Sequence, residues 1–293
     1  MRLLQLKVVL AAVDLDDASV AIVEAARELA LAAGAELHVL HASSATDDSA
    51  VRPDGEQAVR HIVEKAGAKP SEATLHLLPG DAVHVVRSLA DKLRADVIVL
   101  GRHRERRAPG LDMGSTALGV VTNSWAPCLV LSRPLRLPLE RIVVPVDLSE
   151  TSRGALVVAL SWASALRGAA VSHGSATTES VKLTALFVDR DGPSGSEQHV
   201  QALDDTLSVL RREAGSWAGV GINGAVTPNS SPAVAIVDYA RAHQAELVVM
   251  GTRGRGLDSA PRVGSTSLEV TRRLDIPTLL VPPAVWEAHG GGR

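Results

Sequence analysis

Short apolar runs alternate with longer amphipathic segments along the whole chain. Runs such as VVLAAV (8–13) and DVIVL (96–100) contain almost no charge, which is typical of parallel strands buried on both faces. The segments between them carry apolar residues at helical spacing and begin with polar capping residues. Each half of the chain is therefore predicted to contain five strands that alternate with helices and form a parallel sheet covered on both faces.

The predicted elements have definite positions. In the first half we expect strands at 7–13, 36–41, 73–77, 96–100 and 128–132, and helices at 18–33, 55–66, 81–93 and 115–124. In the second half we expect strands at 141–146, 181–188, 222–226, 246–250 and 278–281, and helices at 150–166, 197–214, 232–243 and 266–273. Asp81 is the expected cap of one helix, and the Ser231 hydroxyl followed by Pro232 is the expected start of another.

The two halves repeat each other. KVVLAAVDLDDAS (7–19) matches RIVVPVDLSETS (141–152), and 95–134 matches 245–283, where Gly101, Gly114-Ser115-Thr116 and Pro127 recur at a constant offset of 150 positions. A repeat this long indicates two homologous domains. We expect domains at 1–134 and 140–284, a proline-containing link at 132–140 and a loose tail at 285–293.

The segment MGTRGRGLDSAPRVGSTS (250–267) leaves a predicted strand and opens a predicted helix. Its glycines permit tight turns and leave space beside the main chain. Gly264 and the three hydroxyl residues after it place donors at a helix N-terminus, which suits phosphate. The same residues have a purely structural use, since Thr266 and Glu269 fit a capping box. The spacing matches neither a Walker loop nor the dinucleotide fingerprint.

This Gly-x2-Gly-x9-Gly-Ser spacing resembles the ATP-binding signature of the universal stress protein family. The likeness also includes the Val-Asp after the first strand and the final PTLLVP strand (277–282), and it covers nearly all of 6–283. The resemblance implies two doubly wound domains of the adenine nucleotide α-hydrolase-like fold, with ATP, with or without Mg²⁺, as the ligand. The residues it implies for the second half are Pro145, Val146, Asp147, Val188, Met250, Gly251, Gly254, Gly264, Ser265, Thr266 and Ser267. The alternative is that Asp147 only caps the next helix and the glycines only shape a loop.

The first half departs from this signature. The matching residues, a predicted second and weaker site, are Asp14, Ala42, Gly101, Gly114, Ser115 and Thr116. Arg104 replaces the second glycine of the signature, and it either fills the phosphate space or pairs with phosphate itself. We expect nucleotide to bind mainly in the second half; tighter binding by 1–134 would contradict this.

Composition and charge narrow the function further. The chain is 46% hydrophobic with 2% aromatic residues and a net charge of −3, which argues against disorder and gives no sign of nucleic-acid or membrane partners. The single Cys128 cannot form an intrachain disulfide and is expected to be buried. Lys7 interrupts the apolar N-terminal run, which favours a strand over a signal peptide. We therefore expect a cytoplasmic location. His41 could meet His76 or His103 at the strand ends, but no metal site or catalytic residue is predicted.

Three functions remain open. The preferred one is a nucleotide-binding stress protein with a conformational output, in which the last strands of the two domains pair within the chain and the chain forms a dimer, as the resemblance implies. The second is a slow ATPase or a protein that phosphorylates itself on Ser265, Thr266 or Ser267. The third is a scaffold that binds no nucleotide, which co-purified ATP or ADP would exclude.

Overall fold

The computed structural model describes residues 6–43, 53–102, 113–172, 181–190, 196–213, 219–253, 263–283 and 285. The chain separates into two compact units, Gln5–Arg136 and Leu137–Arg293, which we call the first and second domain. The predicted loose tail lies outside the described residues apart from Val285. Pairing of the last strands and dimerisation stay predictions.

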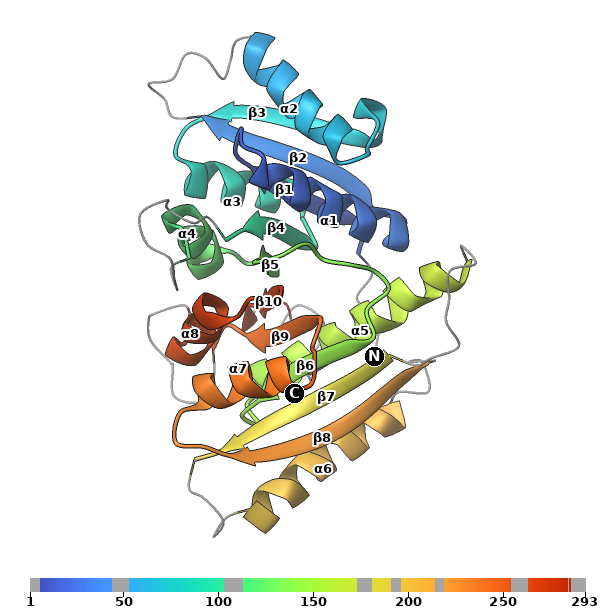
Figure 1. Ribbon diagram of the computed structural model, residues 1–293, viewed down its shortest axis with the longest axis vertical. Coiled ribbons are helices and arrows are strands. Elements are labelled where there is room, and N and C mark those ends of the chain that lie inside the picture. The colour runs from blue at the N-terminus through green and yellow to red at the C-terminus, as the bar shows by residue number, and fades with distance from the viewer. Residues whose placement is uncertain are drawn as a thin grey trace. The chain divides into compact units, whose positions relative to one another are not determined.

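The first domain is a five-stranded parallel sheet in the order β3-β2-β1-β4-β5. Its strands are β1 (Val8–Val13), β2 (Glu36–Ser43), β3 (Ala73–Pro79), β4 (Val97–Gly101) and β5 (Cys128–Leu131). Its helices are α1 (Ala18–Ala33), α2 (Pro53–Lys65), α3 (Ala82–Leu93) and α4 (Ser115–Asn123), with a short η1 (Pro70–Glu72). Helices α1 and α2 contact each other over one face, and α3 and α4 contact each other over the opposite face (Figure 1).

The second domain repeats this arrangement in the order β10-β9-β6-β7-β8. Its strands are β6 (Arg141–Val146), β7 (Val181–Asp189), β8 (Val220–Pro228), β9 (Leu247–Gly251) and β10 (Thr278–Val281). Its helices are α5 (Glu150–Ser172), α6 (Ser196–Glu213), α7 (Pro232–Ala242) and α8 (Ser265–Arg273). The predicted α/β fold of two doubly wound parallel sheets is confirmed, and in each domain the strand order reverses beside the first strand, where such sheets bind ligands.

Small aliphatic side chains fill both cores. Leu10, Ile98 and Leu129 are fully buried in the first domain, and Leu156 and Leu186 in the second. The central strands β1, β4 and β9 are apolar throughout because helices cover both faces of each sheet. Within the described part of the chain, no helix is long and apolar enough to cross a bilayer.

The caps expected for helices α3 and α7 agree with the structure to different degrees. The Asp81 carboxylate accepts a hydrogen bond from the His84 amide at 2.9 Å, as predicted. Ser231 is the N-cap of α7 and Pro232 its first residue, as predicted, but the Ser231 hydroxyl makes no capping hydrogen bond. Asn229 holds this turn instead, because its side-chain oxygen accepts from the Ser231 amide at 2.8 Å.

The capping box expected between Thr266 and Glu269 is also absent from helix α8. The N-cap of this helix is Gly264, so Thr266 lies inside the first turn. Glu269 instead pairs with Arg273 one turn later, at 2.6 Å. The first turn of α8 therefore has no side-chain cap of its own.

The histidine that meets His76 lies three residues before His41, the one that the sequence suggested. His38, not His41, meets it: His38 Nδ1 lies 3.0 Å from His76 Nε2, and the rings stack. His41 Nδ1 lies 3.0 Å from the carbonyl oxygen of Val13. His103 lies outside the described residues. Among the residues described, no group of three or more His, Cys, Asp or Glu side chains is placed to hold a metal ion.

The histidine pair predicts a loss of stability in mild acid. Burial lowers the pKa of His76, and the nearby His38 and Lys92 lower the pKa further. His76 is therefore protonated near pH 6.5 in the unfolded chain but only at lower pH in the folded chain. The free energy of unfolding should fall as the pH decreases from 6.5 to the lowered pKa, and should then level off. Urea denaturation should show a shallower dependence of the free energy of unfolding on pH for His76→Gln, and His61→Gln, at an exposed position of α2, is the control. An unchanged slope in His76→Gln would contradict this assignment.

Candidate functional site

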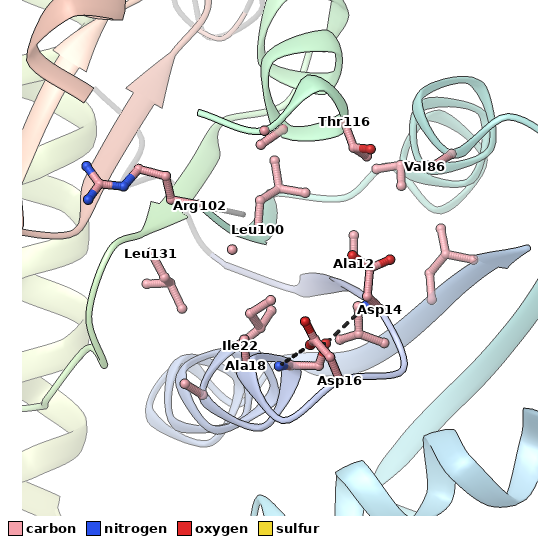
Figure 2. Close-up of a pocket in the computed structure, with 18 of the residues that line it drawn as sticks. Ala12, Asp14, Asp16, Ala18, Ile22, Val86, Leu100, Arg102, Thr116 and Leu131 are labelled. Carbon is pink, nitrogen blue, oxygen red and sulfur yellow. Dashed lines mark hydrogen bonds between the residues drawn. The ribbon is translucent and has the colours of Figure 1, made fainter. Parts of the chain in front are cut away.

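A pocket of about 1050 Å³ lies at the carboxyl edge of the first-domain sheet (Figure 2). Its size is at the upper end of the range for small-molecule sites, roughly 300–1,000 Å³. It lies between the ends of β1 and β4, where the strand order reverses. All the residues that the sequence predicted for this half line it: Asp14, Ala42, Gly101, Gly114, Ser115 and Thr116.

One wall of the pocket is apolar and made of short side chains. Ala12 and Ala42 come from the ends of two neighbouring strands, and Leu40, Leu100 and Ile22 surround them. Alanine at these positions leaves room for a flat apolar group against the sheet. Such a wall excludes water but offers no charge.

The opposite wall is the N-terminus of α4. Gly114 is its N-cap and has no side chain with which to cap the helix. The amides of the first turn lack partners within the helix, as in every helix, and they are directed out of its N-terminus. Ser115 and Thr116 are exposed and line the pocket. This wall therefore offers main-chain and hydroxyl donors with a partial positive charge, which suit an anion.

The turn between β1 and α1 supplies a carboxylate at the pocket (Figure 2). The Asp14 amide donates to Ser19 Oγ at 3.0 Å. Asp16 Oδ1 accepts from both the amide and the hydroxyl of Ser19, at 3.1 and 2.9 Å. The side chain of exposed Asp14 makes no hydrogen bond or ion pair with any residue that the structure describes. Its carboxylate remains available as an acceptor for a ligand.

The second domain brings its predicted residues to the matching edge. Pro145 and Val146 end β6, Asp147 follows them, and Val188 lies near the end of the adjacent β7. Met250 and Gly251 end β9, which pairs with the other side of β6. Gly254, like Arg104 in the first domain, lies outside the described residues.

Hydrogen bonds join the two ends of the glycine loop in this domain. The Gly264 amide donates to the Thr252 carbonyl at 2.6 Å. The buried Ser267 hydroxyl donates to the Gly251 carbonyl at 2.8 Å. Ser265 is exposed and Thr266 partly exposed. The Ser267 hydroxyl proton thus connects α8 to β9, and the exposed donors of this helix start are Ser265 and Thr266.

Asp147 differs from Asp14 in its hydrogen bonds. Its Oδ1 accepts from the Ser149 amide at 3.1 Å and from the Ser149 hydroxyl at 2.5 Å. These are the contacts of a local turn before α5, the structural use that the sequence left open. They do not exclude a ligand, but a ligand has to share or displace them.

Sequence reasoning missed three polar residues near these edges. Asp16 and Ser19 hold the turn beside Asp14, and an aspartate three residues before a serine at the start of a helix is the signal that identifies them. Asp189 ends β7 with a carboxylate that is 1% exposed, and its Oδ2 lies 3.4 Å from His199 Nδ1 of α6. The alternation along β7 places Asp189 on the face opposite Val188, so it supports the edge from the α6 side.

Fold and pocket together define a class: tandem doubly wound α/β domains, the first with a pocket at the switch point of its sheet. The sequence model of the universal stress protein family matches residues 5–132 and 138–282. The chain therefore belongs to the universal stress protein family and carries two such domains.

Individual relatives agree with this assignment. The Thermus aquaticus protein described as "Universal stress protein in QAH/OAS sulfhydrylase 3'region" is 31% identical over 122 residues, which are 40% of this chain and 89% of that protein. A crystal structure of a universal stress protein from Archaeoglobus fulgidus DSM 4304 has a TM-score of 0.68 at 22% identity and covers 95% of this chain and 99% of its own. A functionally unknown protein from Pseudomonas aeruginosa PAO1 has a TM-score of 0.67 at 16% identity, with 98% and 96% covered. The two structures show that the tandem fold is shared.

Proposed function

We propose that this universal stress protein binds an adenine nucleotide, ATP, at the carboxyl edges of its sheets. The observation that carries the proposal is the first-domain pocket, where three kinds of surface face one cavity. They are a wall of short apolar side chains, the carboxylate of Asp14 and the uncapped start of α4. A nucleotide has three matching parts: a flat base, a sugar with hydroxyl donors, and phosphates.

Each part of the nucleotide has a counterpart in the pocket. The base would lie on the apolar wall near Ala12 and Ala42. The Asp14 carboxylate would accept hydrogen bonds from sugar hydroxyls or from an amine of the base. The phosphates would accept from the first-turn amides of α4 and from the hydroxyls of Ser115 and Thr116. Mg²⁺ bound to the phosphates would reduce their negative charge.

The second domain is proposed to bind nucleotide through the matching set. Ser265 and Thr266 at the start of α8 take the place of Ser115 and Thr116, and Asp147 that of Asp14. The loop between Gly251 and Gly264 would lie against the phosphates. Because hydrogen bonds join Gly264 to Thr252 and Ser267 to Gly251, nucleotide that contacts this loop would also stabilise α8. The proposed output is this conformational change.

Asp14→Ala should lower the affinity of the first domain for ATP by at least about tenfold, because hydrogen bonds to a charged group contribute about 1.5–3 kcal/mol. Calorimetric titration of the full chain with ATP measures the loss. Photolabelling with 8-azido-ATP followed by peptide mapping assigns each binding event to a domain. The control is Asp91→Asn, which removes an exposed carboxylate of α3 away from the pocket.

Two outcomes would reject the nucleotide proposal. One is an absence of heat and of photolabelling at millimolar ATP with and without Mg²⁺, which would leave the scaffold as the function. The other is labelling confined to peptides outside both sheet edges. Phosphate release in the same incubations tests the slow ATPase, and release well above that of a Thr116→Ala, Thr266→Ala double variant would favour an enzyme.

A further inference from the structure

We propose that the second residue after the ligand aspartate, Asp16 in the first domain and Ser149 in the second, is a positioning residue that decides whether that aspartate is available to ligand. The inference rests on the proposed function, because it concerns the same two sites. It arises from one difference between two otherwise matching turns, Asp14-Leu-Asp16 and Asp147-Leu-Ser149.

Both turns need an acceptor for the first amides of the following helix. In the first domain the Ser19 amide donates to Asp16 Oδ1 at 3.1 Å, and in the second the Ser152 amide donates to Ser149 Oγ at 3.2 Å. The side chain at this position thus accepts from a first-turn amide in both domains, although the N-cap residue of α1 itself is Asp17. Aspartate and serine perform that task about equally well.

The two capping residues differ in whether they carry a proton. An ionised carboxylate is an acceptor only, whereas a hydroxyl that accepts a hydrogen bond still has its own proton to donate. Ser149 donates that proton to Asp147 Oδ1 at 2.5 Å, a length typical of a hydrogen bond to a charged oxygen. Asp16 has no proton to donate, and its charge disfavours approach of a second carboxylate.

The result is a different state of the ligand aspartate in each domain. Asp147 Oδ1 is engaged by the amide and hydroxyl of Ser149. Among the described residues, the Asp14 side chain has no such bond, and Asp16 Oδ1 instead accepts a hydrogen bond from the Ser19 hydroxyl at 2.9 Å. A nucleotide hydroxyl therefore competes with Ser149 for Asp147, and meets no equivalent competitor at Asp14.

Exchanging the two residues should exchange these states. Asp16→Ser should weaken ATP binding in the first domain about two- to tenfold, the net effect of one hydrogen bond. Ser149→Asp and Ser149→Ala should each strengthen binding in the second domain by a similar factor. The titrations use the full chain, with Asp147→Ala present when the first domain is measured and Asp14→Ala when the second is measured.

If only charge mattered, the ATP affinity of each domain would change in the opposite direction, so the two substitutions distinguish the explanations. Removing the negative charge of Asp16 should favour an anionic ligand, and adding one at Ser149 should disfavour it. Asp17→Asn provides the matched control, since Asp17 lies in the same turn, is 96% exposed and pairs with Lys65 on α2 rather than with the turn. Tighter binding in Asp16→Ser, or weaker binding in both Ser149 variants, would overturn the proposal.

A second measurement needs no nucleotide and separates this inference from the proposed function. The Ser149 amide is bonded to Asp147 and should exchange with solvent faster after Ser149→Asp, while the amide at position 16 should exchange more slowly after Asp16→Ser. NMR hydrogen exchange reads both. If these rates change as expected but no variant binds ATP, the nucleotide proposal fails and the positioning role stands. If the rates do not change, the positioning role fails whatever binds.

Discussion

Gly251→Ala should destabilise the second domain by about 1–3 kcal/mol, the cost of forcing an extra methyl group into a packed region. A Cβ atom at this position would lie 2.8 Å from Thr151 Cγ2, 3.2 Å from the Thr151 carbonyl oxygen and 3.1 Å from the Arg253 carbonyl oxygen. Two of these neighbours are backbone atoms, which cannot rotate away. The glycine is needed because the end of β9 passes directly against the first turn of α5.

The equivalent glycine of the first domain offers a matched control. A Cβ atom at Gly101 would lie 2.8 Å from Ile22 Cδ1, the end of a flexible side chain that can change rotamer. Gly101→Ala should therefore cost clearly less than Gly251→Ala. Because two domains need not unfold together, the comparison requires hydrogen exchange read by mass spectrometry on peptides of each domain. Equal losses in the two variants would contradict the backbone contact as the cause.

Ser267→Ala should also destabilise the second domain by about 1–3 kcal/mol. The Ser267 hydroxyl is buried and donates to the Gly251 carbonyl at 2.8 Å, so its removal leaves a buried acceptor without that partner. The Trp162 side chain, 2% exposed on α5, provides a fluorescence signal for unfolding of this domain. The first domain has Ala117 at the matching position and cannot form this bond.

The same variant distinguishes a structural role of Ser267 from direct phosphate binding. If Ser267 mainly joins α8 to β9, thermal stability falls without nucleotide, and ATP affinity falls as a consequence. If it mainly binds phosphate, affinity falls while the stability of the free protein stays constant. Ser265→Ala, on the exposed side of the same helix start, should leave the free energy of unfolding within about 0.5 kcal/mol.

The fold could be predicted because hydrophobic periodicity and an internal repeat agree. Apolar runs locate strands within a few residues, and the 150-residue offset between the halves shows that both have the same topology. The start of α7 at Ser231-Pro232 was also predictable, but the hydrogen bonds at helix starts were not. The acceptor in the turn before α7 is Asn229 rather than the Ser231 hydroxyl, and the N-cap of α8 is Gly264, because the hydrogen-bond partner depends on backbone direction as well as on residue type.

The sequence predicted which residues come together at the edge of the first sheet, but not the hydrogen bonds that they make. In the first domain every predicted residue lines one pocket, since strand ends and helix starts meet at the switch point of the sheet. The different hydrogen bonding of the Asp14 and Asp147 carboxylates was not predicted, because it depends on whether the residue two positions later has a hydroxyl proton to donate. His38 was missed for a similar reason: adjacent strands place it diagonally across from His76, a relation that spacing within one strand cannot show.

The single thiol has a practical consequence for studying ligand-driven motion. Cys128 is 2% exposed on β5, and burial raises its pKa to about 12, so the reactive thiolate is scarce at neutral pH. A cysteine introduced at Leu15, which is 46% exposed beside Asp14, should be alkylated long before the native one. The unaltered chain is thus a ready background for attaching a single dye or spin label at a chosen point.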